Sequence, residues 1–114
     1  MHTVIRSGKL HPSPGGTIQF EGESYGSEVS FFLVNNEPGA GPRLHRHPYS
    51  ETWIVRSGKA RITADGQEIV AGPGDIIVVS SETAHKFKNI GDDRLDIICI
   101  HSCSRIIQEW LEEG

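Results

Sequence analysis

The chain has 114 residues, the length of one domain, and its 36% hydrophobic and 23% charged residues are typical of a protein with a packed core. It has no apolar run near the roughly 20 residues of a membrane helix and no apolar signal segment after Met1. We therefore expect a cytoplasmic protein without membrane contact. The formal net charge of -4 argues against a nucleic-acid partner, which requires a basic surface.

Glycine and proline content indicates the fold class. Thirteen glycines and six prolines disfavour helix interiors and favour tight turns, which predicts many short strands. Residues 1–27 are turn-rich and are expected to form an N-terminal arm and an edge strand around Ile18 and Phe20. Further strands are expected at 28–35, 44–47, 52–56, 60–64, 67–70, 75–79, 85–89 and 94–101. Strands at intervals of about 8–12 residues predict an all-β sandwich or barrel over residues 28–101.

The last segment, 102–114, departs from the strand pattern. Its apolar residues recur at helical spacing, at Ile106, Ile107, Trp110 and Leu111. Ser104 is a suitable N-cap for a helix that starts there. The pattern therefore predicts a short amphipathic C-terminal α-helix that belongs to the same domain as the barrel.

Three histidines and one glutamate form a candidate metal site. His45 and His47 are two residues apart in an expected strand, so their imidazoles project from one face. Glu51 can add an oxygen from the next strand, and His85 opens a later strand. Such a set suits one divalent transition metal ion (Fe, Mn, Ni, Co, Cu or Zn) rather than Ca or Mg. A six-coordinate ion would keep two positions open for substrate or water.

A His-x-His pair alone is also common at purely structural positions, so the spacing of the surrounding residues matters. One motif is glycine, five residues, His-x-His, three residues, glutamate, six residues, glycine, and it is met at Gly39, His45, His47, Glu51 and Gly58. A second motif ends in histidine, three residues, asparagine, and it is met at Gly74, His85 and Asn89. Ser80 and Glu82 stand where this second motif usually has proline and glycine.

Through these two motifs the chain resembles the cupin family. The resemblance implies a double-stranded β-helix, or jelly-roll, barrel that holds a metal ion inside. It implies His45, His47, Glu51 and His85 as the ligands of that ion. Glu82 would have to adopt the positive φ of the glycine that it replaces, at a cost of roughly 1 kcal/mol.

Residues next to the expected ligands are candidate substrate contacts. Period two places Arg43 on the face of His45, where its guanidinium can bind a carboxylate or phosphate; alternatively, the chain twists it outward to a surface acid. Trp53 shares a face with Glu51, and Phe87 shares a face with His85. These two aromatic residues either line a substrate pocket or pack in the core.

Four other residues allow two interpretations each or are expected to be structural. Tyr49 is either a hydrogen-bond donor or general acid at the site or a surface residue of the bend. His101 either lines the barrel interior, on the face of Cys99, or ends its strand near the surface. Cys99 and Cys103 are expected to pack as free thiols, since two cysteines without regular spacing make no disulfide framework.

The sequence also allows predictions of oligomeric state and function. Residues 76–79 and 97–100 are apolar on both faces, which predicts a homodimer because large exposed apolar patches are rare on monomers. The favoured function is a metal-dependent enzyme that acts on a small polar or anionic metabolite by isomerisation, lyase or dioxygenase chemistry. The alternative is a non-catalytic, metal-containing module that binds or senses a small molecule, because one fold hosts many functions.

Overall fold

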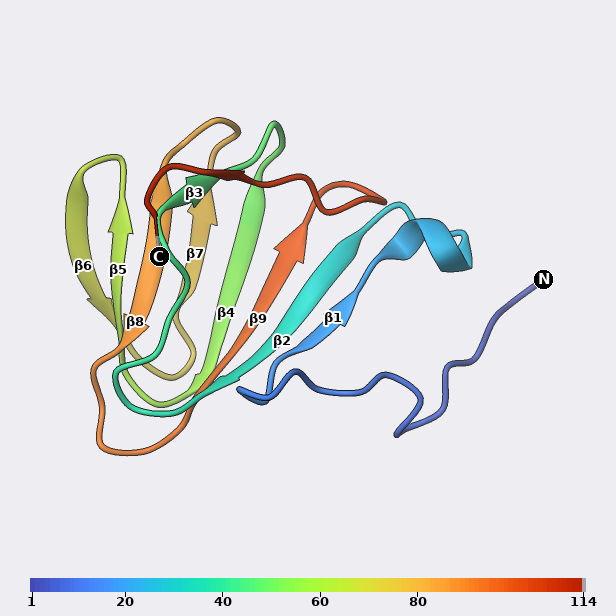
Figure 1. Cartoon of the computed structure of the whole chain (residues 1–114), viewed down its shortest axis with the longest axis horizontal. Helices are drawn as coiled ribbons and strands as arrows, with labels where there is room; N and C mark the ends of the chain where they lie inside the picture. The colour runs from blue at the N-terminus through green and yellow to red at the C-terminus, as the bar shows by residue number, and fades with distance from the viewer. Residues whose placement is uncertain (114) are drawn as a thin grey trace.

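The structure, a computed structural model, describes residues 1–113. Two five-stranded antiparallel sheets lie face to face (Figure 1). The first has the order β1-β2-β9-β4-β7, and the second has the order β10-β3-β8-β5-β6. The strands are β1 (Ile18–Phe20), β2 (Ser30–Asn36), β3 (His45–Arg46), β4 (Glu51–Ser57), β5 (Ala60–Ala64), β6 (Gln67–Ala71), β7 (Ile76–Val79), β8 (His85–Asn89), β9 (Leu95–His101) and β10 (Glu109–Trp110). The prediction of an all-β jelly-roll barrel is confirmed.

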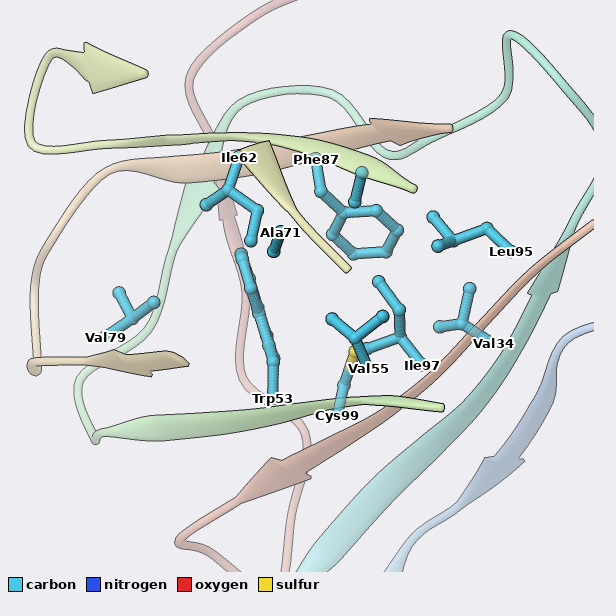
Figure 2. Close-up of a cluster of buried hydrophobic side chains, with 11 residues drawn as sticks. Val34, Trp53, Val55, Ile62, Ala71, Val79, Phe87, Leu95, Ile97 and Cys99 are labelled. Carbon is cyan, nitrogen blue, oxygen red and sulfur yellow. The ribbon is translucent and has the colours of Figure 1, made fainter. Parts of the chain in front are cut away.

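The hydrophobic core lies between the two sheets. Figure 2 shows Ile62 and Phe87 of the second sheet facing Trp53, Val55 and Ile97 of the first. Buried and partly exposed residues alternate along β9 from Leu95 to His101, as the period of a strand requires. This alternation turns every second side chain of β4 and β9 into the barrel.

Two turns have the positive-φ backbone that the sequence motifs predicted for them. Asp65 and Gly66 both have positive φ, at 52° and 74°, and join β5 to β6 as a tight hairpin. Glu82 also has positive φ, at 64°, although it is not glycine. Its backbone N–H donates to the carbonyl of His47 at 2.7 Å. The turn of the second motif is therefore kept, and it lies against the first motif.

The prediction of a C-terminal α-helix is wrong. Residues 102–113 contain no helix: the chain bends at 102–105, and β10 pairs with β3 through Glu109 opposite Arg46 and Trp110 opposite His45. In Figure 1 this red segment crosses the end of the barrel at which β3 lies. Hydrogen bonds to β3 replace those that a helix would make within itself, so the segment becomes an edge strand. Gly114, the last residue of the predicted helix, lies outside the described residues.

Outside the two sheets, residues 1–17 contain no strand, and one 3-10 helix, η1 (Gly22–Tyr25), follows β1. Cys99 and Cys103 are both free cysteines. Among residues 1–113, helices of the length and apolar character needed to span a bilayer are absent.

Candidate metal centre

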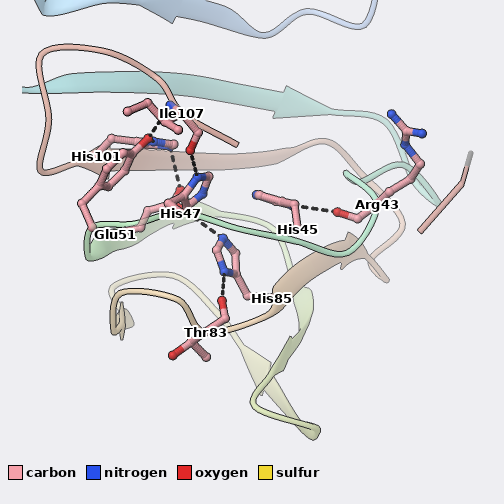
Figure 3. Close-up of polar contacts among 9 residues, drawn as sticks. Arg43, His45, His47, Glu51, Thr83, His85, His101 and Ile107 are labelled. Atoms are coloured by element: carbon pink, nitrogen blue, oxygen red, sulfur yellow. Dashed lines mark hydrogen bonds and ion pairs between the residues drawn. The ribbon is translucent and has the colours of Figure 1, made fainter. Parts of the chain in front are cut away.

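The four predicted ligands meet at one end of the barrel. His45 lies in β3, His85 begins β8, Glu51 begins β4, and His47 lies just after β3. All four residues are buried, and one potential ligand atom from each lies within 4.8 Å of all the others. His45 and His85 are direct cross-strand neighbours, whereas Glu51 comes from the opposite sheet. The cluster therefore joins the two sheets (Figure 3).

Backbone carbonyls set the orientation of all three imidazoles. The Nδ1 atoms of His45 and His85 lie 2.7 Å from the carbonyl oxygens of Arg43 and Thr83, respectively. Nδ1 of His47 lies 2.8 Å from the carbonyl oxygen of Ile107. A carbonyl can only accept, so each Nδ1 carries the ring proton and donates it. A neutral ring that carries its proton on Nδ1 has a lone pair on Nε2, as a metal ligand requires.

The donor set fits a cation. Oε1 of Glu51 lies 3.0 Å from Nε2 of both His47 and His85. In the neutral rings all three of these atoms are acceptors, and they repel one another unless a proton or a metal ion lies between them. Three neutral imidazoles and one carboxylate also carry a single negative charge, which a divalent ion more than balances. Such a nitrogen and oxygen set suits a transition metal.

The pKa values of two ligands favour their metal-binding forms. Burial lowers the pKa of His45 to about 4; His85 and His47 act in the same direction, against the hydrogen bond to the Arg43 carbonyl. His45 is therefore neutral at pH 7. Burial alone would raise the pKa of Glu51, but its side-chain contacts, first among them the hydrogen bond from His101, hold that pKa well below its usual range. Glu51 is therefore ionised.

A cavity of about 440 Å³ opens beside the cluster. Its lining includes His45, Glu51 and His101. Most of its wall is aromatic or aliphatic, from Phe32, Val34, Trp53, Phe87, Cys99 and Trp110. Its remaining polar side chains are neutral, from Thr17, Gln19, Asn36 and Gln108. The structure thus places Trp53 and Phe87 both in this wall and in the buried core.

Arg43 does not line this cavity. Its guanidinium lies over the ring of Trp110, 4.6 Å from the ring centre, and the same indole packs against His45. Its side chain lines a separate surface groove together with Arg61 and Lys88. Arg43 therefore contributes a backbone carbonyl to the cluster, whereas its charge is directed elsewhere.

Tyr49 and His101 both contact the cluster: His101 lines the barrel interior, and Tyr49 lies half-buried beside it. Nε2 of His101 lies 3.2 Å from Oε2 of Glu51, and its Nδ1 lies 2.6 Å from the Tyr49 hydroxyl. Burial raises the pKa of Tyr49 to about 12, so the phenol keeps its proton at neutral pH. Burial likewise raises the pKa of the Cys99 thiol, which also hydrogen-bonds Glu51.

The role of Ile107 could not be seen in the sequence. Its carbonyl oxygen accepts from His47, and its N–H donates to the Tyr49 hydroxyl at 3.1 Å. An isoleucine gives no signal for a role played by its backbone. The only available hint was that residues 106–111 are apolar and must therefore cover some surface.

Comparison with known proteins agrees with this architecture. The family profile described as Cupin domain matches residues 32–101. Quercetin 2,3-dioxygenase of Bacillus subtilis (strain 168) is 36% identical over 65 residues, covering 54% of this chain and 19% of that protein. Oxalate decarboxylase OxdC of the same organism is 34% identical over 93 residues, covering 73% of this chain and 24% of that protein.

Comparison with solved structures also finds an oxalate decarboxylase. A structure of Bacillus subtilis oxalate decarboxylase, a protein described with Mn(II) centres, superimposes with a TM-score of 0.77 at 29% identity. The match covers 90% of this chain and 29% of that one. The chain thus spans less than a third of the length of these relatives. Since the profile covers more than half of the chain and the fold agrees with it, the chain belongs to the cupin family.

Proposed function

We propose that this cupin is a metal-dependent enzyme that acts on a small molecule. It binds one divalent transition metal ion through His45, His47, Glu51 and His85. The observation that carries the proposal is the orientation of the three imidazoles, whose Nδ1 protons are all held by carbonyls so that Nε2 is free. When bound, such an ion supplies Lewis acidity, and a redox-active ion also supplies oxygen chemistry. Isomerase, lyase and dioxygenase reactions all fall within that range.

The cavity lining restricts the substrate. One end of the molecule must carry oxygen or nitrogen donors that reach the ion, and the rest must suit walls such as Phe32, Trp53 and Phe87. Four ligands with one negative charge and a divalent ion leave one positive charge, which a single anionic oxygen balances. A second negative charge would be buried without a partner, because within residues 1–113 the cavity lining includes neither Lys nor Arg. The favoured substrate is therefore neutral or singly charged.

Metal content tests the proposal directly. Protein purified without a His tag and reconstituted anaerobically with Fe(II), Mn(II) or Co(II) is expected to retain about one equivalent after gel filtration, because the site offers four preformed donors. Elemental mass spectrometry measures this equivalent. Less than about a tenth of an equivalent of every metal would overturn the proposal, since one site per chain requires stoichiometric binding.

Turnover separates an enzyme from a binding module. Loaded protein is incubated with neutral aromatic and aliphatic compounds that carry adjacent oxygen atoms, and oxygen uptake and product formation are followed. Oxygen uptake with Fe(II) indicates a dioxygenase, whereas an isomer or fragment formed without oxygen indicates an isomerase or a lyase. Ligand binding without any product would overturn the enzymatic part of the proposal.

We further propose that the chain forms a homodimer through the outer face of the β1-β2-β9-β4-β7 sheet. One apolar row crosses all five strands of this face, through Ile18, Leu33, Ile98, Ile54 and Ile76. Ile76 and Val78, on the edge strand β7, are 66% and 68% exposed. An uncharged apolar row of this kind is suited to packing against the same row of a second copy.

The dimer prediction is tested by light scattering after size exclusion. The parent protein is expected to have twice the chain mass, and the Leu33→Lys/Ile76→Lys double variant is expected to have the mass of one chain. The matched control is Ile69→Lys/Val70→Lys, which places two lysines at similarly exposed positions of β6 in the other sheet and should leave the dimer intact. A parent protein with the mass of one chain at micromolar concentration would contradict the prediction.

A further inference from the structure

A chain of hydrogen bonds runs from the C-terminal segment to Glu51 through two residues outside the proposed ligand set. The N–H of Ile107 donates to the Tyr49 hydroxyl at 3.1 Å, and that hydroxyl lies 2.6 Å from Nδ1 of His101. Nε2 of His101 then lies 3.2 Å from Oε2 of Glu51. Tyr49 is partly buried, and His101 and Glu51 are fully buried.

The partners fix the direction of each hydrogen bond. A carboxylate oxygen accepts, so Nε2 of His101 is the donor in its 3.2 Å contact with Oε2 of Glu51. In a neutral ring Nδ1 is then an acceptor, and the Tyr49 hydroxyl lies within hydrogen-bonding distance of it. The Tyr49 oxygen accepts from Ile107, which leaves its own proton for His101. Every donor along this series of contacts from Ile107 to Glu51 therefore has an acceptor.

His101 thus has the opposite tautomer to the three proposed ligands. His45, His47 and His85 donate from Nδ1 to carbonyls and keep a lone pair on Nε2. His101 has its proton on the nitrogen that faces the cluster, so it offers a donor where the others offer a lone pair. Although it is a cross-strand neighbour of Glu51, it is suited to holding the carboxylate and unsuited to binding a cation.

We propose that Tyr49 and His101 are a positioning pair that holds Oε2 of Glu51 away from the three ligand histidines, so that Oε1 alone is offered to the ion. The inference rests on the metal site proposed above. The two carboxylate oxygens already have separate surroundings: Oε1 faces His47 and His85, and Oε2 faces His101. A carboxylate held in this way binds through one oxygen and leaves more of the ion accessible.

Packing supports the role of Tyr49. Its ring stacks on that of His47, with an interplanar angle of 5° and ring centres 5.1 Å apart. The backbone of Ile107 contacts both side chains: its N–H donates to the Tyr49 hydroxyl, and its carbonyl accepts from His47. Tyr49 therefore orders one ligand by stacking and a second ligand, Glu51, through His101.

Cobalt substitution tests the pair, because the visible spectrum of Co(II) reports the ligand geometry without any turnover. His101→Leu removes the donor to Oε2 and is expected to weaken Co(II) binding about 10–100-fold in chelator competition, the usual cost of losing a partner of a ligand. It should also change the shape of the Co(II) spectrum. His101→Gln keeps an N–H donor and should restore most of the affinity and the parent spectrum.

Tyr49→Phe tests the hydrogen bond between the Tyr49 hydroxyl and His101. It keeps the stacked ring but leaves Nδ1 of His101 without a donor, so a smaller loss of affinity and a shifted spectrum are expected. Tyr25→Phe is the control: it removes a partly exposed hydroxyl from η1 and should change neither. If His101→Leu does not fold, as judged by thermal unfolding without metal, His101→Gln and Tyr49→Phe still carry the test.

The experiment distinguishes failure of the proposed metal site from failure of the positioning pair. A parent protein that binds no Co(II) would overturn the proposed metal site and the positioning pair with it. A parent that binds Co(II), together with folded His101→Leu and Tyr49→Phe variants of unchanged affinity and spectrum, would overturn the positioning pair alone. A His101→Gln variant as weak as a folded His101→Leu variant would show that the N–H donor is not what His101 contributes.

Discussion

A Glu51→Gln variant is expected to lose more than about 100-fold in affinity for a divalent ion, because loss of a direct ligand should exceed the 10–100-fold cost of losing a ligand's partner. Gln keeps the size of the side chain but removes its charge. Three neutral imidazoles would then hold a buried divalent ion with no negative charge beside it, which is costly at such low exposure. Chelator competition with Zn(II) or Co(II) measures the loss.

The matched control for this experiment is Glu68→Gln. Glu68 is an exposed residue of β6 whose nearest cationic group, on Arg61, lies 4.0 Å away, so its loss should leave metal affinity unchanged. Equal metal affinity in Glu51→Gln and the parent protein would contradict the assignment of Glu51 as a ligand. Equal weakening in both variants would indicate that net charge, and not coordination, controls retention.

The barrel and the candidate ligands could be predicted because both depend on short-range patterns. Alternation along β4 and β9 places residues such as Trp53 and Ile97 inside, whatever the strand order is. His45 and His47 are two residues apart, so one strand brings them together. The position of His85 came from the spacing of the second motif and not from its own neighbours.

Tyr49 and His101 could not be assigned in the same way. Their contact depends on the pairing of β4 with β9, in which Glu51 lies opposite His101. A shift of one residue in that register would turn His101 to the other face of the sheet. The sequence determines which residues alternate, but it does not show which residue of a distant strand lies opposite.

The C-terminal segment shows a second limit. Ile106, Ile107, Trp110 and Leu111 are spaced as in an amphipathic helix, but the spacing does not exclude an extended segment with apolar contacts on both sides. The N–H of Leu111 donates to the carbonyl of Leu44 at 2.9 Å, a partner 67 positions earlier by residue number. Tertiary contacts of this kind override a local preference for helix.

Arg43 shows why period two alone could not decide between the inward and the outward orientation that the sequence left open. An inward Arg43 requires the strand of His45 to extend back to residue 43, but β3 begins at His45. Before that point the chain is a loop, in which side chains need not alternate. The Arg43 side chain instead packs on Trp110, in a segment that was expected to be helical.

Gly41→Ala is expected to cost about 3 kcal/mol in the free energy of unfolding, at the upper end for overpacking, because the rigid backbone leaves little room to adjust. An added Cβ would lie 1.9 Å from the carbonyl oxygen of Phe87 and 2.9 Å from its carbonyl carbon. Just before Gly41 the loop is also hydrogen-bonded to β8, through Gly39 to Asn89 and through Asn89 to Ala40. Thermal unfolding should show a melting temperature lowered by more than about 10 °C.

Substitutions of two other glycines separate the steric clash of the added Cβ from the general effect of replacing glycine with alanine. Gly72→Ala adds a Cβ with no atom within 4 Å and at no positive φ, so stability should stay the same or rise slightly. Gly39→Ala also meets no atom, but its φ of 87° should cost about 1 kcal/mol. Because the loop leads directly into β3, Gly41→Ala should also displace His45 and lower metal affinity, which Gly72→Ala should not do. A Gly41→Ala protein as stable as Gly72→Ala would show that this loop does not lie against β8 as described, and the position of His45 would then need another support.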